Sequence, residues 1–283
     1  MPGIKRRDPV VSGIFYPEKP EAVCARLASW GLNESSNCPA IGSQAIIAPH
    51  GAWDFSGSIA GKAFAAARNL PLTGFQRPPG KGISRVLLLG PCHHPIEEGI
   101  YLSESVSFET PLGPLQVDWK LNRELASCSA QIRFNDIPHL SEHSLEVLLP
   151  IVKYCFSQVS IVPILVSGRG PAVVSALAGA LRTGFSEYPE ESLIVISSCV
   201  SQYPDEALAL SMAEEFRRLL ERMDPRAFLA GLEEGRITAC GGALVAALME
   251  SGVMAGKRFN SLGPLSRGKG GLGETIYYGA FGA

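Results

Sequence analysis

The sequence predicts an α/β fold: a single layered domain with a largely parallel central sheet flanked by helices. Two observations predict it. Short apolar runs rich in Val, Ile and Leu alternate along the chain with longer helix-like segments. The runs are nearly continuous in hydrophobicity, as strands are when helices cover both faces of a sheet. Strands and helices in this order are typical of layered α/β proteins.

The expected strands are short. A turn cluster from Thr110 to Pro114 lies between extended residues and predicts a hairpin over 108–117. The tail, 274–281, has the pattern of a final strand. The clearest apolar runs, which we expect to form the central sheet, are 45–48, 85–90, 159–166 and 192–197.

Helices are expected between these strands. The first covers 57–70 and begins at a Ser56 cap. A helix over 141–156 would place four apolar side chains on one face. Asp224 followed by Pro225 predicts a capped helix that extends to about Leu232. The remaining expected helices are 171–183, 205–223 and 243–251.

The chain of 283 residues is long enough to bury a sizeable core. No low-complexity linker divides it, and the Pro/Gly-rich stretch 70–82 is only as long as a loop. We therefore expect one domain over 1–283.

Composition excludes several classes of protein. With 46% hydrophobic and 18% charged residues, the chain is not intrinsically disordered. The net charge of −2 and the lack of a basic block disfavour nucleic-acid binding. No apolar run approaches the roughly 20 residues that cross a bilayer. The region 1–20 lacks the apolar core of a signal peptide, and seven scattered cysteines do not predict a disulfide framework. We expect a cytoplasmic protein with no membrane contact.

Four unusual residues lie where predicted strands end or a helix begins. His50 follows the first run, His93 the second and Cys199 the run at 192–197, and Cys240 precedes a helix. Functional groups collect at the carboxyl edge of open α/β sheets. Two imidazoles with thiolates suit Zn or Fe. The alternatives are loop histidines bonded to the backbone and cysteines that act as small buried hydrophobes.

Other candidates have competing interpretations. Glu142, His143 and Ser144 are adjacent in sequence, which does not make them a triad, since neighbours on a helix point about 100° apart. His143 either reaches the pocket as a proton carrier or caps a helix. We expect His94 to orient its loop and His139 to be solvated. A nucleophilic role for Cys199 would need a lowered pKa.

The stretch 268–273 matches GxGxxG. Dinucleotide binding needs a strand before this sequence and a helix after it, whereas a strand-like run follows here. We therefore expect a loop. With Arg267 and Lys269, an anion-contacting lid is the alternative.

Nine segments in order along the chain resemble the Memo family, also called AmmeMemoRadiSam system protein B. They span nearly the whole chain. The segments are VSGIFYP at 11–17, APHG at 48–51, FSG at 55–57, LGPCHH at 89–94, TPLG at 110–113 with Val117 and Asp118, EHSLE at 142–146 with Leu149 and Pro150, VPILV at 162–166, Ser197 with Ser198, and Cys240 with Gly241.

The resemblance implies a fold similar to the class III extradiol dioxygenases, which use non-haem iron. It implies a metal-binding pocket lined by His50, His93 and Cys240. The Asp and His of the family's SSDxxH element complete that pocket. This chain has Cys199 in place of the Asp and Gln202 in place of the His. Gln202 cannot exchange a proton near neutral pH, so the usual acid/base group is missing.

We therefore expect a metal-dependent redox or hydrolytic enzyme that uses non-haem Fe(II) or Zn and lacks the usual acid/base histidine. The expected ligands are His50, His93, Cys199 and Cys240, and the catalytic candidates are His143, Cys199 and Gln202. The alternative is a catalytically degenerate binding or scaffold module. In both cases the expected partner is a small-molecule or peptide ligand, and the chain is a monomer or a homodimer.

Overall fold

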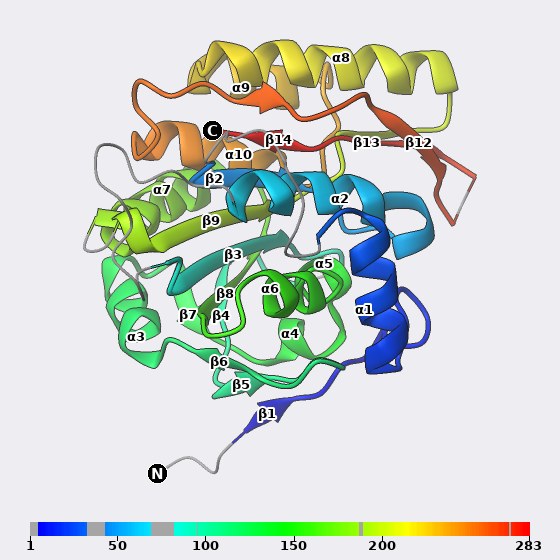
Figure 1. Cartoon of the computed structure of the whole chain (residues 1–283). Coiled ribbons are helices and arrows are strands. Elements are labelled where there is room, and N and C mark those ends of the chain that lie inside the picture. The colour runs from blue at the N-terminus through cyan, green and yellow to red at the C-terminus, as the bar shows by residue number, and fades with distance from the viewer. Residues whose placement is uncertain (1–4, 33–42, 69–81, 95, 187–188, 272) are drawn as a thin grey trace.

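A computed structural model describes residues 5–32, 43–68, 82–94, 96–186, 189–271 and 273–283 (Figure 1). An 11-stranded sheet forms its centre, and a three-stranded sheet lies beside it. Five neighbouring strands of the large sheet are parallel, which confirms the predicted fold class. In spatial order they are β6 (Leu115–Val117), β8 (Ser160–Ser167), β3 (Arg85–Pro91), β9 (Ser192–Ser197) and β2 (Ala45–Ala48). The four predicted apolar runs form β2, β3, β8 and β9.

Shorter strands complete the large sheet. The predicted hairpin over 108–117 is confirmed, because β5 (Ser107–Phe108) pairs antiparallel with β6. The remaining strands are β1 (Arg6–Arg7), which pairs with β5; β4 (Gly99–Leu102), which pairs with β8 and with β7 (Ile132–Phe134); and β14 (Phe281–Gly282), which lies between β2 and β11 (Asn260–Ser261).

The small sheet is antiparallel and contains β10 (Ser201–Tyr203), β13 (Thr275–Tyr278) and β12 (Ser266–Lys269) in that order. The prediction that the tail 274–281 forms a single strand is wrong. The tail contains two strands, because β13 joins the small sheet and β14 joins the large one. The chain changes sheets at Gly279, where a side chain would come within 2.8 Å of the Phe281 ring.

Helices cover both faces of the large sheet (Figure 1). Alternate residues of β3 pack into different cores: Leu87 and Leu89 face one cluster, and Val86 and Leu88 face the other. Burial on both faces explains why the strands are continuously apolar in sequence. The first core contains α3 (Trp119–Cys128), α7 (Pro171–Ser186), α8 (Glu206–Arg222), α9 (Pro225–Glu233) and α10 (Gly242–Ser251), and the second contains α1 (Pro20–Ser29), α2 (Trp53–Arg68), α5 (His143–Glu146) and α6 (Leu149–Cys155).

Two aspartates cap helices, and the cap at Asp224 confirms the predicted one. Asp224 accepts hydrogen bonds from the amides of Arg226 and Ala227 at 3.0 and 3.1 Å, directly before α9. Asp205 accepts one from the amide of Leu208 at 2.8 Å and begins α8. Each satisfies amides that the first turn of a helix leaves without a partner.

The start of α2 differs from the prediction. The helix begins at Trp53, and Ser56 lies in its first turn rather than at its cap. The Ser56 hydroxyl donates to the carbonyl of Gly51 at 2.8 Å, and the buried Trp53 indole donates to the carbonyl of Val147 at 2.9 Å. Burial of the tryptophan therefore places the first turn earlier. Residues 69–81, which contain most of the predicted loop 70–82, lie outside the described residues.

The single helix expected over 141–156 is wrong. Three short helices occupy this region: α4 (Ile137–Ser141), α5 and α6. Glu142 is extended between the first two, with φ −77° and ψ 130°, and its carboxylate caps α5. Pro150 lies in the first turn of α6, where its missing N–H costs nothing. The apolar face was predicted correctly, since Leu145, Leu148, Leu149 and Val152 are all buried.

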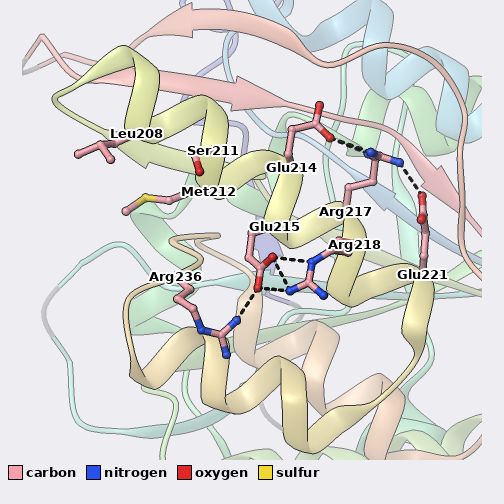
Figure 2. A pocket seen from close by; sticks show the side chains of 9 residues that line it. All are labelled: Leu208, Ser211, Met212, Glu214, Glu215, Arg217, Arg218, Glu221 and Arg236. Carbon is pink, nitrogen blue, oxygen red and sulfur yellow. Dashed lines mark hydrogen bonds and ion pairs between the residues drawn. The ribbon is translucent and has the colours of Figure 1, made fainter.

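The outer face of α8 is a shallow, charged surface (Figure 2). Arg217 pairs with Glu214 and Glu221, while Glu215 pairs with Arg218 and with Arg236 beyond α9. These pairs lie at the surface, where solvent screens the charges, so each contributes little to stability. Their charges neutralise one another, so this surface presents no concentrated charge to a ligand.

In the described part of the chain, no helix is long and apolar enough to span a bilayer.

Candidate metal centre

Three neighbouring parallel strands bring the predicted residues to one edge of the sheet. Strand β9 lies between β3 and β2, with Ser197 in register with Ala48 and Ile196 with Leu89. His50 follows the end of β2, His93 follows β3, and Cys199 follows β9. Cys240 joins them from the turn before α10. The residues expected at strand ends therefore meet, although they are far apart in sequence.

Three imidazole rings form the centre of the site. The His50 and His93 ring centroids lie 5.1 Å apart, and His143 lies 5.5 Å from the first and 4.9 Å from the second. One ring nitrogen from each histidine lies within 4.8 Å of the others. His143 begins α5, so it enters from a helix rather than from a strand end.

A serine fixes the orientation of His50. The Nδ1 atom of this buried ring lies 2.6 Å from the hydroxyl oxygen of Ser197. That hydroxyl donates its own proton to the carbonyl of Ser144 at 2.5 Å, so it can only accept from Nδ1–H of His50. In the neutral ring, Nε2 then carries a lone pair. It lies 3.5 Å from Sγ of Cys240.

A buried carboxylate orients the other two histidines. Glu142 accepts hydrogen bonds from Nδ1 of His93 at 2.9 Å, from the His93 amide at 2.6 Å and from the Ser144 amide at 2.9 Å. Nδ1 of His143 lies 3.2 Å from the same carboxylate. Burial alone would raise the pKa of Glu142, but the hydrogen bonds and charge of His93 lower it to about 2. Glu142 is therefore ionised at neutral pH.

The two histidines beside Glu142 have opposite titration behaviour. Burial opposes the charged form of His93, yet hydrogen bonds with Cys240 and Glu142 raise its pKa to about 10. Burial lowers the pKa of His143 to about 4, and the nearby His50 contributes to the shift. At neutral pH in the metal-free protein, His93 is a cation and His143 is a neutral base.

Two sulfur atoms lie against this cluster. Sγ of Cys240 accepts a hydrogen bond from the Cys199 amide at 3.0 Å, and Sγ of Cys199 accepts one from the Cys240 amide at 3.4 Å. The bond to Cys240 and burial raise the pKa of Cys199 well above its usual value. Burial works against the Cys240 thiolate, but the Cys199 thiol and the positive charge that His50 carries when its ring is protonated hold the pKa of Cys240 well below its usual value.

Glycine lets the two sulfur-bearing segments approach. The Gly241 amide donates to the Ser198 hydroxyl at 2.9 Å. A side chain at Gly241 would meet Cβ of Ser198 at 2.7 Å and the Ser197 carbonyl at 2.8 Å. Any larger residue would push Cys240 away from Cys199.

The cluster lines a pocket of about 390 Å³. Phe15 packs edge-on against His143 with ring centroids 5.1 Å apart. Gln202 and Lys269 reach the pocket from the small sheet, so Gln202 lies where a polar side chain can contact a ligand. Burial raises the pKa of Tyr278, which also lines the pocket, to about 12.

The other histidines lie outside the ligand cluster. Nε2 of His94 lies 3.3 Å from the Ser141 carbonyl, as expected of a residue that orients its loop. The expectation that His139 is solvated is wrong, because this residue is 2% exposed. It belongs to α4, and its Nε2 lies 3.1 Å from the Tyr101 carbonyl.

The glycine-rich stretch 268–273 begins in β12, which ends at Lys269. The element that follows the stretch is the strand β13, where dinucleotide binding needs a helix. Lys269, Gly270 and Gly271 instead line the pocket.

The N-terminal segment holds α5 through contacts that the sequence did not predict. Arg7 and Glu146 form a buried ion pair, and Arg7 also donates to the carbonyls of His139 at 2.8 Å and Glu142 at 3.1 Å. Glu146 in turn accepts hydrogen bonds from the Val10 amide and from other groups of the N-terminal segment. The sequence signal was faint, since EHSLE contains both functional carboxylates, Glu142 and Glu146, but gives no sign of their partners.

These donors fit a transition-metal ion. Ligand atoms about 2.1 Å from one ion lie at most about 4.2 Å apart, so small ring rotations bring the three histidines into range. Ser197 and Glu142 hold Nδ1 of His50 and His93, as acceptors commonly do behind ligating imidazoles. Imidazole with thiolate suits Zn and Fe.

Comparisons with known proteins agree with the resemblance. The family model described as "Memo-like protein" matches residues 7–263. A MEMO1 family protein of Thermotoga petrophila is 28% identical over 253 residues, covering 86% of this chain and 87% of its own. One from Metallosphaera sedula is 27% identical over 262 residues, covering 89% and 88%.

A solved structure supports the fold alone. The uncharacterized protein JW3007 from Escherichia coli K12 has a TM-score of 0.50 and 14% identity, covering 83% of this chain and 98% of its own. The family match extends over nearly the whole chain, from β1 into the segment after β11. The chain therefore belongs to the Memo-like protein family.

Proposed function

We propose that this Memo-like protein is a metal-binding protein whose ion, non-haem iron or zinc, is held by His50, His93 and Cys240. Cys199 is a further sulfur donor, and His143 lies close enough to act as an alternative ligand. One observation carries the proposal. The Ser197 hydroxyl accepts a hydrogen bond from Nδ1–H of His50, and this bond orients the ring so that Nε2 faces Cys240. Histidines that ligate metal ions almost always donate their other ring N–H to such an acceptor.

We further propose that the pocket performs redox or hydrolytic chemistry on a small or peptide-like molecule. A bound iron or zinc ion would supply Lewis acidity, and iron would add redox chemistry. His143, neutral because its pKa is about 4, can accept a proton at Nε2 while Glu142 holds the other side of the ring. Tyr278 stays protonated and can donate a hydrogen bond. Gln202 can orient a ligand but cannot move a proton.

A second candidate function is a binding or scaffold module without catalysis. It is favoured by Gln202, which lines the pocket where the resemblance implies an acid/base histidine. Apolar walls at Phe15 and Ile276, beside an exposed Phe55, suit a peptide or an apolar small molecule. In this case the metal would be structural, with four protein donors and no open position.

Metal analysis tests the proposal. The chain is expressed in a reducing cytoplasm, where we expect it to function, and purified without an affinity tag, and its Fe, Zn and Cu contents are measured. We expect close to one ion per chain, and at least a tenfold loss in the double variant His50→Ala, His93→Ala. His94→Ala, a histidine of the same loop outside the cluster, is the control and should keep its metal. Negligible metal in all three proteins would refute the proposal.

Substrate access distinguishes the two candidate functions. A loaded protein with an open coordination position binds a small anion such as azide, and this binding changes the absorption spectrum of iron or of substituted cobalt. No spectral change in a fully loaded protein would favour the module.

A further inference from the structure

Cys199 and Cys240 lie side by side, although they are 41 positions apart in the sequence. Each backbone amide donates to the sulfur of the other residue, at 3.0 and 3.4 Å. A disulfide between them therefore requires adjustment of side-chain torsions rather than a rearrangement of β9 or α10.

The pair is accessible from the pocket, which both residues line. Cys199 is 4% exposed, whereas Cys240 is only partly buried and faces Nε2 of His50 at 3.5 Å. A small oxidant in the pocket therefore meets Cys240 first. The Cys199 sulfur lies behind it, in the position of a resolving thiol.

We propose that Cys199 and Cys240 are a dithiol/disulfide couple that hydrogen peroxide oxidises through the pocket, and that the disulfide removes both sulfur donors from the metal centre. The first part depends only on the geometry of the two cysteines. The second part rests on the proposed metal-binding function.

The reaction balances in two steps. The Cys240 sulfur attacks one oxygen of hydrogen peroxide: an S–O bond forms, the O–O bond breaks, and the departing hydroxide takes the proton from Cys240 to leave as water. The Cys199 sulfur then attacks the resulting sulfenic acid: the S–S bond forms, the S–O bond breaks, and hydroxide leaves as water with the proton of Cys199. The thiols lose two electrons and two protons, and peroxide is reduced to two waters.

The test uses the full-length chain stripped of metal. It is treated with one equivalent of hydrogen peroxide, unfolded in the presence of N-ethylmaleimide and digested with trypsin without reductant. Each cysteine then lies in a separate peptide, 183–217 for Cys199 and 237–257 for Cys240. We expect these peptides to be cross-linked and to separate on treatment with dithiothreitol.

Two variants provide controls. Cys92→Ser should still form the cross-link, since the Cys92 sulfur contacts the His94 carbonyl rather than this pair. Cys199→Ser should lose it and accumulate a Cys240 sulfenic acid that dimedone traps. Oxidation of Cys240 to sulfinic acid while Cys199 still reacts with maleimide would overturn the couple, as would full labelling of both thiols.

A second arm tests the consequence for metal. The reduced and the oxidised chains are each reconstituted with Fe(II) or Zn(II) and desalted. We expect at least tenfold less retained metal after oxidation. Equal retention by both forms would overturn the link between disulfide and metal. Failure of the reduced chain to bind metal would instead refute the proposed function, while a cross-linked peptide would still establish the couple.

Discussion

The hydroxyl of Ser197 lies 2.6 Å from Nδ1 of His50 and thereby determines which nitrogen of that ring faces the pocket. The hydroxyl can do so because its own proton is donated to the Ser144 carbonyl, 2.5 Å away. A serine at the end of β9 and a carbonyl of α5 thus set the tautomer of a histidine that follows β2.

Replacing this serine should weaken metal binding without removing a ligand. In Ser197→Ala the His50 ring loses its acceptor, so both its tautomer and its orientation become less restricted. We expect metal affinity to fall about 10- to 100-fold, as when groups behind a ligating histidine are removed. Competition with a chromophoric chelator measures the change. Ser127→Ala, whose hydroxyl contacts only its own helix, is the control; equal affinity in the two variants would contradict the role of Ser197.

Glu142 should affect both stability and metal binding. Glu142→Gln keeps the shape of the side chain but replaces one carboxylate oxygen with an NH2 group, which is a donor. The groups around it, from His93 and Ser144, are donors as well and would lose an acceptor. Leaving such buried donors unpaired costs about 1–3 kcal/mol of unfolding free energy. Urea unfolding measures this loss, and metal titration should show an affinity at least tenfold lower. Wild-type values for both would show that the carboxylate charge has no role.

The buried pair of Arg7 and Glu146 should be far more important for stability than a surface pair. Arg7→Met leaves the Glu146 carboxylate buried without its cation, which costs about 3–5 kcal/mol. Arg26→Met breaks an exposed pair with Asp54 and should cost no more than about 1 kcal/mol. Chemical denaturation of both variants checks the difference, and similar losses would contradict it.

His139 should make stability fall in mild acid. Burial lowers its pKa to about 4 in the folded chain, against 6.5 for an ordinary histidine. Nε2 bonds the Tyr101 carbonyl, while the buried Nδ1 has no hydrogen-bond partner, so a proton added there would find no acceptor. Between pH 6.5 and 4 the unfolded chain therefore binds more protons than the folded chain, and stability decreases as pH falls.

The contribution of this one group approaches about 1.4 kcal/mol per pH unit. His139→Gln should be less stable than the wild type at pH 7.5 but should lose less stability between pH 6.5 and 4.5. Unfolding free energies at several pH values provide the comparison. Parallel profiles for the two proteins would exclude His139 as a source of the acid sensitivity.

Much of the sheet could be predicted from sequence because its central strands are buried on both faces. That burial makes runs such as 192–197 continuously apolar, and β9 has the predicted bounds. The helix expected over 141–156 failed for a different reason. Its apolar spacing is correct, but Glu142 leaves the helical conformation to bind His93, 49 residues away, and no local pattern contains that contact.

The candidate site, like the fold, could be predicted from the sequence only in part. Parallel strand ends predicted that His50, His93 and Cys199 would meet, because the edge of a parallel sheet collects such residues. The groups that orient them could not be predicted, since they act through tertiary hydrogen bonds between distant segments. Ser197, for example, contacts His50 across 147 residues.

Element-specific anomalous diffraction from crystals of the untagged protein tests the central claim most directly. Data collected on both sides of the Fe and Zn absorption edges would locate and identify any bound ion. We predict one peak within ligand distance of the ring nitrogens of His50 and His93 and of the Cys240 sulfur. A map from fully occupied, untreated crystals with no peak at this position, or with its only peak elsewhere on the chain, would contradict the account.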